Sequence, residues 1–232
     1  MEFEQKIHST ALIHPKSKIH PTVKIGAYSV VGENVQIDKG SEIGNFVTLA
    51  GNTTIGVDNK IYHYCSLGEA PQDKKFKNEK TYLSIGDGNT IREFCTFNVG
   101  TIDGGGVTQV GNNNWIMAYV HIAHDCKLGN DIVLANNSSL AGHVEIDNFA
   151  ILGGFTLVHQ FCKIGAHIIT AVGAIILMDI PPYIRVAGDN AKPNGINIEG
   201  LKRRKFSPQV IADIKKAYKI IYREGNTIVV AK

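Results

Sequence analysis

An aliphatic residue occupies every sixth position over much of this 232-residue chain. One run extends from Ile13 to Leu67, and another extends from Val110 to Ile164. The residue two positions earlier is usually small or β-branched, and because strand side chains alternate between faces, both recurring positions point the same way. No α-helical period places an apolar residue at every sixth position. The pattern predicts an all-β solenoid, a parallel β-helix whose short strands bury their apolar faces only against neighbouring coils.

The four cysteines share one place in the repeat, two residues before a recurring apolar position. They are Cys65, Cys95, Cys126 and Cys162. This is the small inward position, and the chain has no C-x-x-C pair. The pattern therefore predicts buried free thiols in preference to disulfides or metal ligands.

Composition and charge narrow the class of protein. The chain is 44% hydrophobic and 19% charged, and its net charge of +3 is too small to indicate a nucleic-acid partner. No run of 18 apolar residues could cross a membrane, and Met1 leads into acidic residues where a secretion signal would be basic. We therefore expect a cytoplasmic enzyme that neither binds nucleic acid nor inserts into a membrane.

Two segments interrupt the repeat, at about residues 69–84 and 99–108. The first is polar and lysine-rich, and the second contains Gly104-Gly105-Gly106. A solenoid accommodates insertions as loops on one face, and such loops often bind ligands. Taken alone, each segment is explained equally well as a solvated excursion.

The repeat fails near Ile180, and Pro181-Pro182 is predicted to stop the strand pattern. A helical pattern follows. Ser207-Pro208 resembles an N-cap with proline in the first turn, and the apolar residues beyond it have helical spacing up to about Gly225. A shorter helical piece is expected over residues 197–204.

These observations divide the chain into two regions. We expect a β-helix over residues 1–190, which carries both inserted loops, and a short helical C-terminal region over residues 191–232. The last residues, 227–232, are expected to form no complete element.

Four of the nine histidines lie within 39 residues: His121, His124, His143 and His159. If three hexapeptides form one coil, residues 18 positions apart stack about 4.8 Å apart on adjacent coils. One such column contains His124, Gly142 and Gln160, and the next contains Asp125, His143 and Phe161. This rule places Asp125 nearer to His143 than to His124.

The two columns supply the components of acyl transfer. They are a general base, a carboxylate that orients it, and a backbone N–H that faces a developing oxyanion. Two alternatives remain open at this point. The histidines could be ordinary corner or surface residues, or three imidazoles could converge on a zinc ion with an open position for water.

Several motifs together resemble one family, the UDP-N-acetylglucosamine O-acyltransferases of lipid A synthesis. The resemblance spans about residues 8–225. Its motifs are His121-Ile-Ala-His-Asp-Cys126, Leu134-Ala-Asn-Asn137, Leu140-Ala-Gly-His143, Val158-His-Gln-Phe161, Ile164-Gly-Ala-His167, Pro181-Pro-Tyr183 and Asn197-Ile-Glu-Gly-Leu-Lys-Arg-Arg204. The resemblance implies a left-handed parallel β-helix, an exception to the usual right-handed crossover, and a homotrimer with active sites between subunits.

The resemblance also implies the reaction. An (R)-3-hydroxyacyl chain moves from acyl carrier protein to the glucosamine 3-hydroxyl of UDP-N-acetylglucosamine, without a cofactor and without a metal. Residue by residue, His124 matches the general base, Asp125 its orienting carboxylate, and Gly142 the oxyanion donor. The residues that match substrate-binding positions are Gln72, Asp73, Lys75, His121, His143, His159, Gln160, Asn197, Glu199, Arg203 and Arg204.

The chain departs from the family pattern at three places. Asn98-Val-Gly-Thr101 lacks an arginine that many members have, and the helical C-terminal region is expected to be shorter than the family's. Val172 matches the position that gauges acyl length. Glycine at that position goes with long chains, so the valine predicts a preference for about 10 to 12 carbons.

Two competing functions remain open. One is N-acylation of a 3-amino analogue of the UDP-sugar, and the other, from a different class, is a zinc-dependent trimeric β-helix hydratase. No residue in the sequence separates the ester-forming from the amide-forming enzyme, whereas metal analysis would identify the hydratase.

Overall fold

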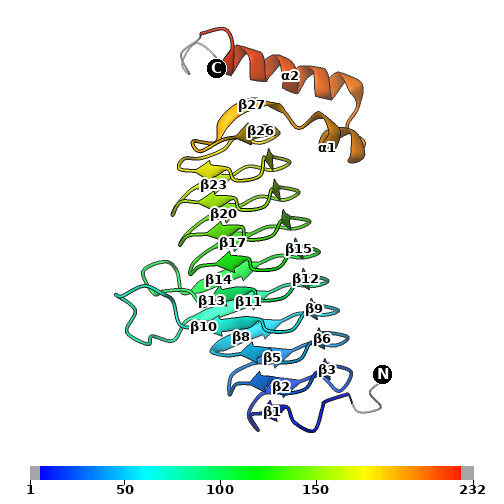
Figure 1. Ribbon diagram of the computed structural model, residues 1–232, viewed down its shortest axis with the longest axis vertical. Coiled ribbons are helices and arrows are strands. Elements are labelled where there is room, and N and C mark those ends of the chain that lie inside the picture. The colour runs from blue at the N-terminus through cyan, green and yellow to red at the C-terminus, as the bar shows by residue number, and fades with distance from the viewer. Residues whose placement is uncertain (1–5, 226–232) are drawn as a thin grey trace.

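The computed structural model describes residues 6–225. Short strands follow one another around three sheets, and the coils stack into an elongated β-helix with two helices at its C-terminal end (Figure 1). Paired residues such as Leu12 and Val30 lie 18 positions apart on neighbouring parallel strands. The predicted coil of three hexapeptides is therefore confirmed.

Each sheet collects every third strand as far as β25, and β26 and β27 both join the third sheet. The first sheet contains β1 (Leu12–Ile13), β4 (Val30–Val31), β7 (Thr48–Leu49), β10 (Ser66–Glu69), β13 (Thr96–Asn98), β16 (His121–Ile122), β19 (Ser139–Leu140), β22 (Leu157–Val158) and β25 (Ile175–Ile176). The second contains β2 (Lys18–Ile19), β5 (Gln36–Ile37), β8 (Asn52–Ile55), β11 (Tyr82–Ile85), β14 (Val107–Val110), β17 (Lys127–Leu128), β20 (Glu145–Ile146) and β23 (Lys163–Ile164). The third contains β3 (Lys24–Ile25), β6 (Glu42–Ile43), β9 (Lys60–Ile61), β12 (Thr90–Ile91), β15 (Trp115–Ile116), β18 (Val133–Leu134), β21 (Ile151–Leu152), β24 (Ile169–Thr170), β26 (Ile184–Ala187) and β27 (Lys192–Ile196).

The repeat aliphatics form one continuous core. Val31, Leu49 and Leu67 illustrate the pattern, because each is at most 1% exposed. Full burial of such a side chain contributes roughly 1.5–3 kcal/mol, which explains why the coils are stable only when stacked. All four cysteines are buried free thiols, as predicted.

Each coil turns at three corners, and many corner residues have positive φ. At the corner between the third and first sheets these residues are mostly aromatic, and their rings stack at centroid distances of 4.8–5.2 Å. We call this column the aromatic edge; it consists of Tyr28, Phe46, Tyr64, Phe94 and Tyr119. Ring stacking offsets part of the cost of left-handed backbone, which is about 1–2 kcal/mol per residue.

The two inserted segments form loops between strands. The first joins β10 to β11, and the second joins β13 to β14. Both leave the solenoid on the same side, near its middle (Figure 1). The second loop is the shorter, and it returns to the coil beside the turn that holds His124 and Asp125.

The C-terminal helices are confirmed. α1 (Ile198–Arg203) begins at the N-cap Asn197, and α2 (Pro208–Tyr222) begins at Ser207, whose hydroxyl accepts from Val210 N. Among residues 6–225, no helix is long and apolar enough to cross a membrane. The expectation for residues 227–232 lies outside the described residues.

The prediction that Pro181-Pro182 stops the strand pattern is wrong. β26 continues the third sheet in parallel with β24, and β27 then pairs with β26 in antiparallel fashion. Val186 pairs with Thr170, sixteen positions earlier, so this coil is two residues short of the usual eighteen. Because this coil is shorter, a search for apolar residues at every sixth position does not detect the repeat here. The expected domain boundary at residue 190 falls between these two paired strands.

Candidate active site

The corner between the first and second sheets brings the predicted catalytic residues together. His124 and Asp125 lie in the turn between β16 and β17, and His124 Nδ1 is 2.8 Å from Asp125 Oδ2. His143 Nε2 lies farther from that oxygen, at 3.8 Å. The prediction that Asp125 is nearer to His143 is therefore wrong. Asp125 has a φ of 61°, and in left-handed backbone the side chain leaves the strict alternation on which the stacking rule depends.

The Asp125 carboxylate is fully buried and held from the second inserted loop. Thr101 donates to it twice, from its hydroxyl to Oδ2 at 2.6 Å and from its backbone N–H to Oδ1 at 2.8 Å. The Thr108 hydroxyl accepts from Asp125 N at 2.8 Å. Sequence reasoning missed both threonines. The stacking rule cannot place Thr101, which lies in the insertion, whereas Thr108 lies in β14, seventeen positions before Asp125, where the rule does apply.

Gly142 lies against the His124 ring on the next coil, as the column predicted. A Cβ at this position would lie 2.6 Å from Cε1 and 2.8 Å from Nε2 of His124. Within the described part of the chain, the Gly142 N–H donates to no protein acceptor. A free donor beside the imidazole is suited to receive an oxyanion.

The other histidines surround this corner to different degrees. The His143 ring meets the His124 ring edge-on at 5.1 Å and stacks on Phe161 at 4.3 Å. His121 projects from β16, where its Nδ1 is 2.8 Å from the Thr96 hydroxyl. His159 and Gln160 are exposed, and the His159 ring contacts the Gln160 carbonyl.

Burial lowers the pKa of His121 below its ordinary value of 6.5. The hydrogen bond with Thr96 raises this pKa, and the nearby His124 lowers it. Unfolded chains take up this proton near 6.5, so stability should fall as pH drops from 7 to 5. We expect His121→Gln to reduce the slope of the free energy of unfolding against pH in that window. Urea unfolding at pH 7, 6 and 5 measures the slope, and equal slopes in the two proteins would contradict the assignment.

His124, Asp125 and His143 also form a possible metal-binding group, since one ligand atom of each lies within 4.8 Å of the others. The arrangement does not favour a cation. Asp125 Oδ2 is already shared by His124 and Thr101, and Oδ1 accepts from the Thr101 backbone. A cation would have to displace donors that hold the carboxylate in place.

The remaining predicted substrate residues lie elsewhere on the chain. In the first loop, Lys75 N donates to Asp73 Oδ1 at 2.9 Å, and the Gln72 and Lys75 side chains are exposed. At the C-terminal end, the Asn197 side chain accepts from Gly200 N and donates to His167 O. Four pairings in the third sheet separate β15, on the coil of His124, from β26 at this end, so this end lies about 20 Å along the axis from His124.

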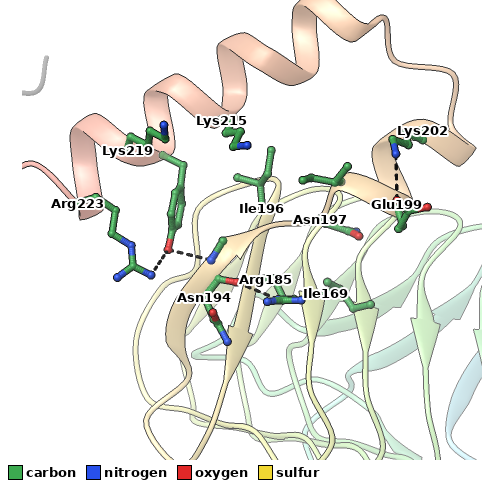
Figure 2. A pocket seen from close by; sticks show the side chains of 13 residues that line it. Ile169, Arg185, Asn194, Ile196, Asn197, Glu199, Lys202, Lys215, Lys219 and Arg223 are labelled. Carbon is green, nitrogen blue, oxygen red and sulfur yellow. Dashed lines mark hydrogen bonds and ion pairs between the residues drawn. The ribbon is translucent and has the colours of Figure 1, made fainter.

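A cavity of about 740 Å³ lies between α2 and the last strands (Figure 2). Asn197 and Glu199 line it, and the Gly195 N–H donates to the Tyr218 hydroxyl on its wall. Glu199 pairs with Lys202 at 3.2 Å. Arg203 and Arg204 do not line the cavity. The Arg204 guanidinium lies 3.8 Å above the Phe149 ring.

Val172 is 75% exposed at the corner between the third and first sheets. His124 occupies a different corner, between the first and second sheets. A pocket for the acyl chain that reaches both His124 and Val172 therefore cannot be formed by adjacent residues of one coil.

The solenoid and this corner define a hexapeptide-repeat transferase. The family described as bacterial transferase hexapeptide (six repeats) matches residues 16–51 and 108–142, and the family described as UDP N-acetylglucosamine O-acyltransferase, domain 2, matches residues 179–232. An acyl-[acyl-carrier-protein]–UDP-N-acetylglucosamine O-acyltransferase from Thiobacillus denitrificans is 57% identical over 97% of this chain and 88% of its own length. One from Herminiimonas arsenicoxydans is 57% identical over 97% and 86%.

Solved structures similar to this chain belong to the same family of acyltransferases. The UDP-N-acetylglucosamine acyltransferase of Francisella novicida superposes with a TM-score of 0.95 at 46% identity, over 97% of this chain and 83% of that one. The corresponding enzyme of Acinetobacter baumannii gives 0.95 at 41% identity, over 98% and 88%. This chain belongs to the UDP-N-acetylglucosamine O-acyltransferase family, and its left-handed parallel β-helix with small C-terminal helices is as predicted.

Proposed function

We propose that this protein transfers an (R)-3-hydroxyacyl chain from acyl carrier protein to the 3-hydroxyl of UDP-N-acetylglucosamine, the first step of lipid A biosynthesis. One observation carries the catalytic part of the proposal. A buried carboxylate orients His124 at 2.8 Å, and a free Gly142 N–H lies beside the same ring. Family membership supports the substrates.

The geometry suggests how the proton moves. A carboxylate only accepts, so His124 Nδ1 carries the hydrogen and Nε2 keeps its lone pair. Nε2 takes the proton of the sugar 3-hydroxyl as that oxygen attacks the thioester carbonyl. The Gly142 N–H receives the oxyanion. Collapse breaks the carbon–sulfur bond, and the departing thiolate takes the proton from the imidazolium.

The test offers purified protein two acceptors, UDP-N-acetylglucosamine and its 3-amino analogue, with 3-hydroxyacyl carrier protein as donor. We expect product from the hydroxyl acceptor after exhaustive chelation as well as before it. Product from the amino sugar alone would favour the amide-forming enzyme. Stoichiometric zinc whose removal abolishes activity would favour the metal-dependent class.

We propose further that three copies assemble into a homotrimer, with each active site between two of them. In the first sheet, no strand begins with a residue that is charged at neutral pH. In the second sheet, half of the strands begin with lysine or glutamate. Among residues 6–225, more than half of the exposed large apolar side chains gather on the first sheet and along the corner between the third and first sheets. They are Leu12, Tyr28, Val30, Phe46, Tyr64, Phe94, Tyr119, Phe155, Leu157 and Val172. A contiguous neutral surface of this kind is typical of a protein–protein interface.

A charge on this surface should weaken assembly. Leu157 is 45% exposed on β22, and we expect Leu157→Lys to shift sedimentation from trimer toward smaller species at micromolar concentration. Thr54→Lys places the same charge on the second sheet and should leave the trimer intact. A monomeric wild-type protein would contradict the proposal.

Val172 should limit the length of the acyl chain. Its side chain occupies space that glycine would leave open, and each methylene buried contributes about 0.8 kcal/mol. We expect the wild type to prefer about 10 to 12 carbons and Val172→Gly to prefer longer chains. Initial rates with carrier-protein donors of graded length measure the preference. A wild-type preference for about 14 carbons would contradict it.

The remaining predicted residues complete the proposed site. Gln72, Asp73 and Lys75 would reach the nucleotide sugar. The sugar-nucleotide and acyl sites would be lined by His121, His143, His159 and Gln160. Asn197, Glu199, Arg203 and Arg204 would hold the nucleotide, where guanidinium groups suit diphosphate oxygens. We place the reaction in the cytoplasm, and the four free cysteines support this assignment.

A further inference from the structure

The second inserted loop holds the carboxylate that orients His124. Asp125 Oδ2 receives two hydrogens, from His124 Nδ1 at 2.8 Å and from the Thr101 hydroxyl at 2.6 Å. Its partner Oδ1 receives the Thr101 backbone N–H at 2.8 Å. One threonine therefore donates to both oxygens of the carboxylate and restrains its rotation about the Cβ–Cγ bond.

The loop is shaped around this contact. A Cβ on Gly104 would overlap all three atoms of the Asp125 carboxyl group, and a Cβ on Gly100 would come within 2.8 Å of Oδ1. Gly104 N also donates to the Thr101 hydroxyl at 3.2 Å, which leaves the hydroxyl hydrogen directed at Asp125. Glycines at these positions let the loop close against the carboxylate.

We propose that Thr101 is a positioning residue for catalysis, which acts through Asp125 to hold His124 in its proton-accepting tautomer. The inference rests on the function proposed above. Without the hydroxyl, Oδ2 loses its shortest hydrogen bond, and only the Thr101 N–H on Oδ1 still restrains the carboxylate from the loop. The acceptor that keeps hydrogen on Nδ1 of His124 and the lone pair on Nε2 is then held less firmly.

The test compares Thr101→Val, which keeps the shape and removes the hydroxyl, with Thr101→Ser, which keeps the hydroxyl. We expect Thr101→Val to lower kcat by about 10- to 100-fold, while KM for both substrates stays within about threefold. Thr101→Ser should restore kcat to within about threefold of wild type. A merely structural role would not give this division between kcat and KM together with rescue by serine.

A second readout does not depend on acyl transfer. Nitrogen-15 NMR of labelled histidine reports which His124 nitrogen carries the hydrogen. We expect hydrogen on Nδ1 in the wild type and in Thr101→Ser, and a mixture of tautomers in Thr101→Val. If the wild type transfers no acyl group, the proposed function fails, and the NMR comparison still decides whether Thr101 positions His124.

Thr53→Val is the matched control. The Thr53 hydroxyl is also buried and donates to Ala50 O at 2.6 Å, away from this corner, so its loss should affect stability and leave kcat unchanged. Gly104→Ala is a second variant in case Thr101→Val does not fold, and it should lower kcat by displacing Asp125. Wild-type kcat and an unchanged Nδ1 tautomer in a folded Thr101→Val protein would overturn the proposal.

Discussion

Replacing His124 with alanine is expected to lower turnover by about 10²–10⁴-fold or more and to leave the proposed trimer assembled. The imidazole contacts Asp125 and the edge of the His143 ring and is not part of the apolar core, so the core does not depend on it. The loss should appear in kcat, because the base acts on the reacting proton. Steady-state rates together with sedimentation measure both parts of the prediction.

His20→Ala is a suitable control for that substitution. His20 also bonds to a neighbouring side chain, Thr22, at 2.9 Å, on an exposed turn far from the corner. It should retain wild-type rates. A His124→Ala protein that keeps a tenth of wild-type turnover would show that another group accepts the proton.

Gly142→Ala is expected to cost about 100-fold or more in kcat, although it adds only one methyl group. The new Cβ would lie 2.6 Å from His124 Cε1, so the ring must move away from its position beside Asp125 and the Gly142 N–H. Displacement of a base by about 1 Å is enough for a loss of this size. Turnover and the melting temperature should be measured together, since melting should change little.

Gly154→Ala separates this effect from the general cost of filling a glycine in a turn. Gly154 occupies the equivalent place after β21, and its added Cβ would meet only Asn136 O at an ordinary 3.4 Å. We expect nearly normal turnover. Equal losses in the two variants would show that glycine is needed at both turns for the backbone itself.

The coil register could be predicted because the period is regular. Eighteen-residue spacing placed Gly142 beside His124 and His143 beside Phe161, and both contacts are present. The same rule misjudged Asp125. Its side chain direction depends on a left-handed φ of 61°, which the aliphatic positions do not encode.

Insertions and shortened coils explain the other misses. Thr101 reaches Asp125 from a loop outside the repeat, so no spacing rule relates the two residues. β26 and β27 follow a coil that is two residues short, and the proline pair concealed them. By contrast, both helices were predictable, because capping side chains at Asn197 and Ser207 and apolar residues at helical spacing are local signals.

The most direct test of the central claim is the structure of the product. UDP-N-acetylglucosamine is incubated with 3-hydroxyacyl carrier protein and this protein, and the purified nucleotide is analysed by mass spectrometry and proton NMR. The account predicts one added 3-hydroxyacyl group, as an ester on the glucosamine 3-oxygen. Unchanged nucleotide with every donor, or acylation at any other position, would contradict it.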